Sequence, residues 1–158
     1  YSAVRDDHPY LLDGELNHKS RAIAEACVTF EEWANLFLDA KSVRLDSGPR
    51  NILLHGHCHQ KALVGMEPSI ELLSKIPHSE IIPLDSGCCG MAGSFGYEKE
   101  HYEISRAIGD RKLFPAVRDS GADSVVVAPG FSCRHQIKHF TGKDAVSSMV
   151  LLAKLLRD

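Results

Sequence analysis

With 158 residues, the chain has the length of one ordinary globular domain, and its composition of 44% apolar and 25% charged residues is that of a protein with a real core. A net charge of −3, without a patch that is both basic and aromatic, argues against a nucleic-acid partner. No apolar run approaches the ~20 residues that a membrane span requires. There is no signal peptide, and because the chain begins at Tyr1 rather than Met, we expect an excised piece of a longer protein.

The N-terminal part, residues 1–48, is predicted to be a helical segment that precedes an α/β domain over residues 49–158. The spacing of apolar residues predicts one helix over residues 16–29. Thr29 and Glu32 then have the spacing of a capping box, which predicts that a second helix begins there. The residues expected on the buried face of that second helix are Trp33, Leu36 and Phe37.

Three short apolar runs in the second part are typical of buried parallel strands: Asn51–His55, Glu80–Leu84 and Ser124–Ala128. Pro83 lies in the second run, which argues for an edge position or a strand end. Each run is followed by a loop of small and polar residues and then by a helical segment. The fold class is therefore α/β, with a short, mostly parallel, Rossmann-like sheet in a three-layer α/β/α arrangement. The predicted helices cover residues 66–74, 98–120 with a break or kink at Pro115, 134–140 and 144–156.

Two adjacent cysteines, Cys88 and Cys89, stand between glycines in the stretch Asp85–Gly96. A pair at neighbouring positions does not easily close an ordinary disulfide, and in a helix or strand the two side chains would point in different directions. Both can face one object only where the backbone turns sharply, and glycine permits such a turn. The stretch therefore indicates a metal ion or an iron–sulfur cluster, the alternative being a glycine-rich turn that carries two buried thiols.

The other cysteines strengthen this interpretation because of where they follow the predicted strands. Cys58 comes a few residues after the first strand, Cys88 and Cys89 after the second, and Cys133 after the third. The carboxyl ends of parallel strands share one edge of the sheet, so we expect these four thiols to converge on a metal site there. Cys27 lies in the first helix and is predicted to be a small core residue instead. Five cysteines placed in this way suit a reducing compartment.

Several kinds of site remain compatible with four cysteines. Structural zinc usually takes pairs of ligands two to four residues apart, and the adjacent pair here favours a larger inorganic core. His57 and His59 flank Cys58, so a mixed cysteine and histidine zinc site stays open. A domain with free thiols that binds a small molecule in the same crevice is a further alternative. The residues expected to surround the ligands are His57, His59, Gly87, Gly90, Ser132 and Arg134.

Three motifs in the same order make the chain resemble a known family. They are HGHCHQKAL at residues 55–63, SGCCGMAGSFGYE at residues 86–98 and APGFSCRHQI at residues 128–137. They resemble the cysteine-rich CCG domain that occurs in heterodisulfide reductase and in the iron–sulfur component of glycolate oxidase. The sequence is most similar to the C-terminal iron–sulfur region of FAD-linked oxidases of the D-lactate dehydrogenase type, and the likeness covers residues 52–154.

The resemblance implies an iron–sulfur electron-transfer module of a flavin-linked dehydrogenase or oxidase that acts on a 2-hydroxy acid such as lactate or glycolate. FAD and ferredoxin-like clusters would belong to other parts of the protein or complex, and a quinone or cytochrome would accept the electrons. The metal ligands implied are Cys58, Cys88, Cys89 and Cys133, with no catalytic residue in this chain. The location implied is cytoplasmic and peripheral to the inner membrane.

Two details of the resemblance refine these expectations. The pattern of heterodisulfide reductase ends in C-x-x-C, but Gly130 stands where the first of those cysteines is expected, so an ordinary 4Fe–4S cluster is predicted rather than a noncubane one. An isolated fragment can also stay without a cluster or take zinc. Residues 1–12 resemble the segment after a preceding motif, so residues 1–48 are interpreted as the remnant of a preceding CCG half in a C-terminal fragment that is not active alone.

Overall fold

The computed structural model describes residues 1–40 and 43–157. The chain divides into two compact units, Tyr1–Ser42 and Val43–Asp158, and each is described by itself. Within the described residues, every helix is too short or too polar to cross a membrane.

The N-terminal unit is helical, and its second long helix begins as the sequence predicts. It contains a short π-helical turn (Ala3–Asp7), α1 (His8–Leu11), α2 (Gly14–Ala26) and α3 (Phe30–Ala40). The Glu32 amide donates to the Thr29 hydroxyl over 3.2 Å, and the Thr29 amide donates to the Glu32 carboxylate over 2.7 Å. The two bonds satisfy backbone donors that have no partner inside the helix, so the predicted capping box is confirmed.

The prediction of a buried face on α3 is wrong. Trp33, Leu36 and Phe37 are 50%, 72% and 41% exposed, whereas Ala34 and Asn35 are buried. The Trp33 and Phe37 rings stack on each other with their centroids 5.1 Å apart. Helical periodicity identifies an apolar stripe but does not tell whether the rest of the fold covers it, and here the aromatic rings cover one another in part.

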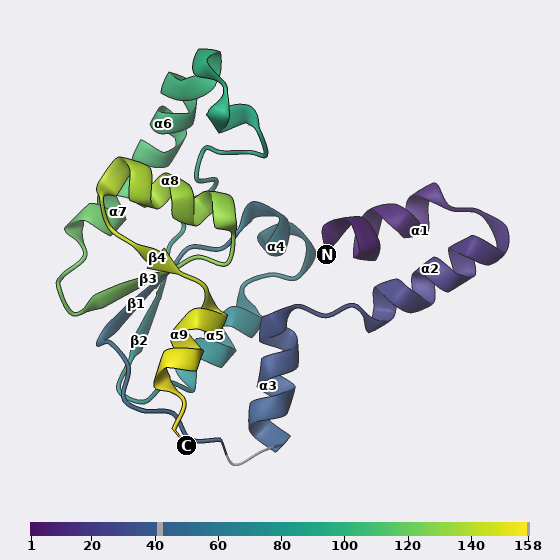
Figure 1. Ribbon diagram of the computed structural model, residues 1–158, viewed down its shortest axis with the longest axis horizontal. Coiled ribbons are helices and arrows are strands. Elements are labelled where there is room, and N and C mark those ends of the chain that lie inside the picture. Colours follow the sequence, from purple (N-terminus) through teal and green to yellow (C-terminus); the bar gives the residue numbers. More distant parts are fainter. Residues whose placement is uncertain (41–42, 158) are drawn as a thin grey trace. The chain divides into compact units, whose positions relative to one another are not determined.

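The second unit is built on a four-stranded parallel sheet. Its strands are β1 (Asn51–Leu54), β2 (Glu80–Pro83), β3 (Ser124–Val127) and β4 (Ala145–Val146), in the spatial order β2-β1-β3-β4. The three predicted strands are confirmed, and β2, which contains Pro83, lies at an edge as expected for a strand with a proline. Figure 1 shows helices α7 and α8 on one side of the sheet and α5 and α9 on the other, which confirms the predicted three-layer α/β/α fold.

The remaining helices connect and cover these strands. They are α4 (Cys58–Leu63), α5 (Glu67–Ser74), α6 (Tyr102–Asp110), α7 (Leu113–Asp119), α8 (Phe131–Thr141) and α9 (Ser148–Leu155). Side chains alternate across the sheet, so Leu53 and Val126 pack with Phe114, Val117 and Ile137 of α7 and α8 in one core cluster. Their strand neighbours point to the opposite face and are fully buried there or nearly so: Ile52, Leu54 and Val127.

The long helix expected over residues 98–120 is interrupted, but not at Pro115. Two short 3₁₀ turns (Phe95–Tyr97 and Lys99–His101) precede α6, and the helix breaks at residues 111–112 before α7. A proline ring clashes with the carbonyl four residues earlier, which for Pro115 is that of Arg111, so a continuous helix is excluded. The break places Pro115 in the first turn of α7, where its missing N–H would have had no helical partner.

The final helix begins later than predicted because its expected first turn is a strand. Ala145 and Val146 pair with Val126 and Val127 of β3 instead. Ser147 then caps α9, and its hydroxyl accepts the Val150 amide over 3.3 Å. A strand of two residues is too short to show a period of its own, so its pairing with β3 is set by the tertiary fold.

The strand order also decides where a ligand can bind. The chain passes from β1 to β2 on one side and then returns past β1 to β3 on the other, so the order reverses between β1 and β3. In open α/β sheets, the crevice beyond the carboxyl ends of the strands at such a reversal is the usual binding site. The cysteines lie just beyond these strand ends: Cys58 is the first residue of α4, Cys88 and Cys89 are in the loop after β2, and Cys133 is in the first turn of α8.

Candidate metal centre

A cavity of about 460 Å³ is formed by the loops that follow β1, β2 and β3. All four cysteines predicted to converge line it, and so do three histidines and a serine: Cys58, Cys88, Cys89, Cys133, His55, His57, His59 and Ser132. The cysteines are far apart along the chain, and the parallel sheet brings them to one place. Each is a free thiol. The structure therefore assembles the four cysteines that the spacing of strands and loops predicted.

The four thiols differ in their exposure. Cys89 and Cys133 are buried, with exposed fractions of 4% and 2%. Cys88 is half-buried, and Cys58, the first residue of α4, is exposed. Cys133 lies in the first turn of α8. The cavity thus has a buried end and an end that solvent reaches.

The turn between the adjacent cysteines and α6 depends on Gly90. Gly90 has a φ of +97°, and a Cβ atom built on it would lie 2.1 Å from the backbone oxygen of Ser105. Ser105 is itself held in place, because Gln136 donates a hydrogen bond to its hydroxyl over 2.7 Å. The Gly90 amide points back and donates to the Cys88 sulfur over 3.3 Å. Gly90 therefore both permits the turn and supplies a donor to a predicted ligand.

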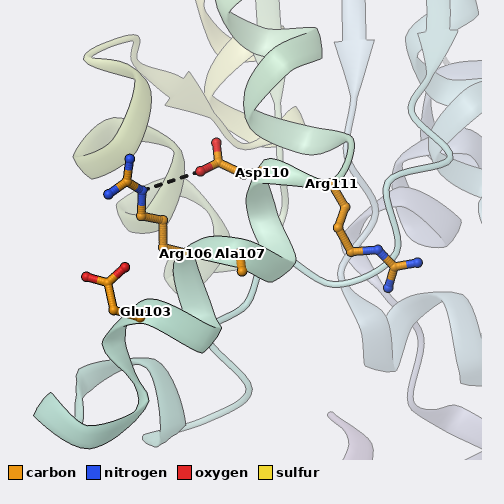
Figure 2. Close-up of a pocket in the computed structure, with 5 residues that line it drawn as sticks. All are labelled: Glu103, Arg106, Ala107, Asp110 and Arg111. Atoms are coloured by element: carbon orange, nitrogen blue, oxygen red, sulfur yellow. Dashed lines mark ion pairs between the residues drawn. The ribbon is translucent and has the colours of Figure 1, made fainter.

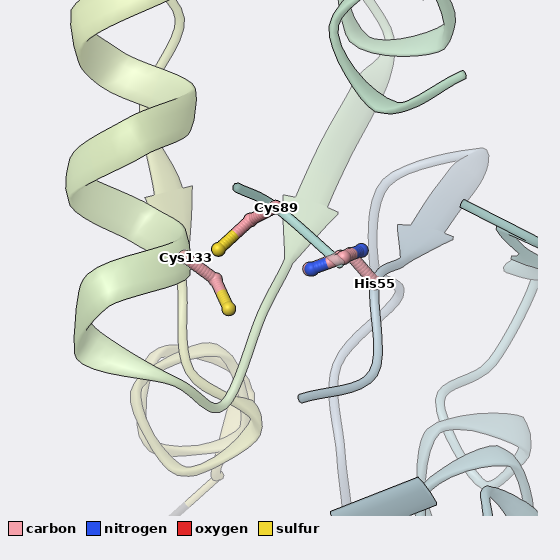
Figure 3. Close-up of side chains that lie close together, drawn as sticks. All are labelled: His55, Cys89 and Cys133. Atoms are coloured by element: carbon pink, nitrogen blue, oxygen red, sulfur yellow. The ribbon is translucent and has the colours of Figure 1, made fainter. Parts of the chain in front are cut away.

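His55 belongs to the site, although the sequence interpretation assigned it to the end of a strand. It is 1% exposed, and a ligand atom of its ring lies within 4.8 Å of the sulfur atoms of Cys89 and Cys133. Figure 3 shows one ring nitrogen on the side of the two sulfur atoms and the other directed away from them. The signal that could have identified His55 is its place as the first residue after β1 at the carboxyl edge of the sheet.

The buried pair of thiols is electrostatically unequal. A hydrogen bond from Cys133, together with hydrogen bonds from His55 and the Met91 amide, lowers the pKa of Cys89 to about 4 even though burial opposes the charge. The same hydrogen bond to Cys89, with burial, raises the pKa of Cys133. Burial also raises the pKa of Cys88. A hydrogen bond therefore joins the two buried thiols, and the Cys89 sulfur is its acceptor.

Three of the predicted neighbours line the cavity beside the cysteines. The rings of His57 and His59 meet edge to face with their centroids 5.3 Å apart, and Ser132 precedes Cys133. Burial, followed by repulsion from His59, lowers the pKa of His57, which keeps its ring neutral and able to bind a metal. A Cβ atom on Gly130 would lie 2.5 Å from the His57 ring and 3.0 Å from the Cys133 sulfur. The His57 ring and the Cys133 thiol therefore approach the backbone at the position where the resemblance expected another cysteine.

The other predicted neighbours act on the loops rather than inside the cavity. The Gly87 carbonyl accepts a hydrogen bond from the Lys61 ammonium over 2.7 Å, which ties α4 to the residue before the adjacent cysteines. The Arg134 guanidinium donates to the carbonyls of Ala128 and Pro129 over 2.9 and 2.7 Å. Arg134 therefore holds the loop that follows β3 and is not among the residues that line the cavity.

A second cavity, of about 420 Å³, lies along α6 and has a different character. Figure 2 shows its lining, in which charged side chains of both signs surround an alanine: Glu103, Arg106, Ala107, Asp110 and Arg111. Arg106 is paired with Asp110 over 3.4 Å. Exposed ion pairs of this kind are typical of a solvated helix face, so the cysteine cavity is the better candidate for a functional site.

The donor set of the cysteine cavity fits a thiophilic metal group. Four thiols and a neutral imidazole are ligands for zinc, iron and iron–sulfur clusters, whereas calcium and magnesium take oxygen ligands. The residues present at the site therefore fit a thiophilic metal group, an iron–sulfur cluster included, in their chemistry.

Comparison with known proteins relates the chain to components and domains of dehydrogenases. It is 34% identical over 155 residues to one of the subunits of the anaerobic glycerol-3-phosphate dehydrogenase of Escherichia coli (strain K12), and the match covers 98% of this chain and 38% of that protein. It is 29% identical over 126 residues to the D-2-hydroxyglutarate dehydrogenase of Pantoea ananatis, where the match covers 79% of this chain and 12% of that protein. The corresponding enzyme of Escherichia coli (strain K12) is 27% identical over 127 residues.

The chain thus spans less than two fifths of the length of these relatives. No protein-family model and no solved structure matches it. The relatives are oxidoreductases, or parts of oxidoreductases, by name, which fits the iron–sulfur region of an FAD-linked oxidase that the sequence motifs indicate.

Proposed function

We propose that this chain is an iron–sulfur electron-transfer module of a flavin-linked dehydrogenase, in which Cys58, Cys88, Cys89 and Cys133 hold the cluster. The observation that carries the proposal is that thiols from three separate segments of the chain, each after a different strand, line one cavity at the carboxyl edge of the sheet. An iron–sulfur cluster bound there would accept and release single electrons. The similarity to dehydrogenases and their components supports a redox role for the same residues.

The residues of the chain have distinct parts in this proposal. Cys89 and Cys133 would anchor the cluster on the buried side, and Cys58 would close the site on the side that solvent reaches. The Gly90 amide, which bonds to the Cys88 sulfur, would stabilise the negative charge of that ligand. Four thiols rather than five favour an ordinary 4Fe–4S cluster, because Gly130 has no thiol to contribute.

The names of the relatives support a proposal for the setting of the module. Both kinds of relative are named as dehydrogenases of hydroxy compounds, one for glycerol-3-phosphate and one for D-2-hydroxyglutarate, which is itself a 2-hydroxy acid. We place this chain beside an FAD-binding domain that would oxidise such a 2-hydroxy acid, of the lactate or glycolate type, and beside ferredoxin-like clusters that would pass the electrons on to the site in this chain. A quinone or cytochrome would take up the electrons, with the complex in the cytoplasm and peripheral to the membrane.

Anaerobic reconstitution with iron and sulfide tests this proposal directly. The chain is expected to bind a cluster with a broad visible absorption band and to give an EPR signal when the cluster changes its redox state. Serine at Cys58, Cys88, Cys89 or Cys133 should lower the iron and acid-labile sulfide content, because each change removes one thiolate ligand. Cys27→Ser is the matched control, since Cys27 lies at the end of α2 and outside the residues that line the cavity.

The same measurement also shows which result contradicts the proposal. Colourless protein after reconstitution, or cluster content that is equal in the four cavity variants and in Cys27→Ser, would exclude the cysteine cavity as a cluster site.

Zinc is a second candidate ligand, favoured by one specific observation. The ligand atoms of His55, Cys89 and Cys133 all lie within 4.8 Å of one another, a spacing that one tetrahedral ion can bridge. In that case, the chain is a zinc-stabilised structural or docking module without redox activity. Metal analysis of protein purified without oxygen separates the two candidates, because one zinc and no iron per chain supports the structural role.

A further inference from the structure

Of the three histidines that line the cavity, His55 is the buried one. It is 1% exposed, whereas His57 is half-buried and His59 is exposed. A buried imidazole needs partners for both ring nitrogens, because an unpaired polar group in the interior costs free energy. Its Nδ1 atom lies 2.6 Å from the hydroxyl of Ser86, which is also buried. One nitrogen is therefore satisfied by the protein, and the other is left for the site.

The Ser86 hydroxyl decides which nitrogen of His55 bears the proton. A hydroxyl has one proton to donate, and Ser86 has two acceptors within reach: His55 Nδ1 at 2.6 Å and the Leu84 carbonyl at 3.4 Å. The second distance is longer than a normal O–H···O hydrogen bond. The hydroxyl proton therefore goes to Nδ1, and the ring bears its own proton on Nε2.

The Nε2–H group then has sulfur within reach. One ring nitrogen lies on the side of Cys89 and Cys133, and a ligand atom of His55 is within 4.8 Å of both sulfurs. Of the two sulfurs, that of Cys89 is the one to which the His55 ring hydrogen-bonds, so it is the acceptor. An imidazole N–H offers that sulfur a donor inside a buried site.

We propose that His55 is a positioning residue of the cysteine site: held by Ser86, it donates its Nε2–H to the Cys89 sulfur and fixes that ligand. The proposal rests on the proposed function, since the ligand it orients is one that would hold the cluster. The segment before Cys88 is also tied down by the bond from Lys61 to Gly87. Residues of the segment that follows β1 thus form hydrogen bonds to two consecutive residues, Ser86 and Gly87.

The test compares the reduction potential and the iron content of clusters reconstituted in the full chain. His55→Leu removes the donor and should shift the potential to more negative values, because the reduced cluster has more negative charge and loses a hydrogen bond. It should also weaken iron retention about tenfold, which is typical when a group that orients a ligand is lost. His55→Gln keeps an N–H group and should restore most of both. His18→Leu, on an exposed position of α2, is the matched control.

The reduction potential of the Ser86→Ala variant is a second test, which stays informative if the His55→Leu variant does not fold. The Ser86→Ala change leaves the imidazole in place but frees its orientation, so the potential should shift in the same direction by a smaller amount. Unchanged potentials in Ser86→Ala and His55→Leu would overturn the proposal. Strong nitrogen hyperfine coupling in the unsubstituted cluster, lost in His55→Gln, would also overturn it by making His55 a ligand. Failure of the unsubstituted chain to bind any cluster is a different result, which refutes the proposed function itself.

Discussion

Gly90 and Gly93 lie three residues apart in the same turn, yet their surroundings differ. Both have a positive φ, +97° for Gly90 and +69° for Gly93. A Cβ atom on Gly90 would meet the backbone of Ser105 in α6, whereas one on Gly93 would meet nothing within 4 Å. Glycine is needed at position 90 both for the positive φ and because a Cβ atom would clash, whereas at position 93 it is needed for the positive φ alone.

This difference predicts unequal costs of two alanine substitutions. Gly93→Ala should lower the free energy of unfolding by about 1–2 kcal/mol, the cost of a left-handed backbone for a residue with a Cβ atom. Gly90→Ala adds a clash with a backbone oxygen and should cost roughly 3 kcal/mol or more. Denaturant unfolding of both variants measures this, and equal losses would show that α6 moves away without cost.

The cysteines of the site were predictable from sequence and His55 was not, for reasons specific to each. Cys58 and Cys133 follow apolar strands at short distances, so topology alone predicts that they share an edge. His55 continues the apolar run of β1, and a histidine at a strand end is more often a core residue than part of a site. Its role depends on the hydroxyl of Ser86, which approaches only after the chain has folded.

At the scale of elements, the capping box of α3 lowers the pKa of one of its own residues, Glu32. Burial by itself would raise the pKa of Glu32, but hydrogen bonds from the amide and hydroxyl of Thr29, together with Arg5, bring it below the usual value. A carboxyl group with a lowered pKa stabilises the folded state above its unfolded pKa, and that stabilisation is lost as the pH falls through the folded pKa.

Thr29→Ala should therefore destabilise the fold by about 1 kcal/mol near neutral pH, which is typical for the loss of a helix cap. The difference between the variant and the unsubstituted chain should shrink as the pH falls through the lowered pKa of Glu32, because the carboxylate then gains a proton and its hydrogen bond from the amide weakens. Thermal unfolding at neutral pH and over a series of acidic pH values tests this, with Thr29→Ser as the control that keeps the hydroxyl. A difference that does not change with pH would separate the cap from the charge of Glu32.

The elements that sequence patterns predicted correctly are those with strong local signals. Pro83 cannot donate a backbone hydrogen bond, and its strand is indeed at the edge of the sheet. β4 was missed because its two residues are defined by their pairing with Val126 and Val127, which are distant in the chain. The prediction of a buried face on α3 was wrong, because an apolar stripe in the sequence does not show whether another element packs against it.

At the scale of the whole molecule, a cluster at this site would join three crossover connections of the sheet. Ligands that bind only the folded chain stabilise it, and metal groups held by several loops do so strongly. The chain without its cluster should therefore unfold at a temperature several degrees lower than the loaded chain. Calorimetry before and after chelation measures this, and a chain with serine at all four cavity cysteines should show no response to the chelator.

The positions of the cavity cysteines along the chain also set the order in which they are translated. Cys58 leaves the ribosome before Cys133, which is completed only after β3 and belongs to a helix that must still form. A nascent chain that has reached only the adjacent cysteines has three of the four cavity thiols and lacks the wall that α8 provides. In the proposed function, iron and sulfide would therefore be delivered only after translation of α8, when all four cavity thiols are present.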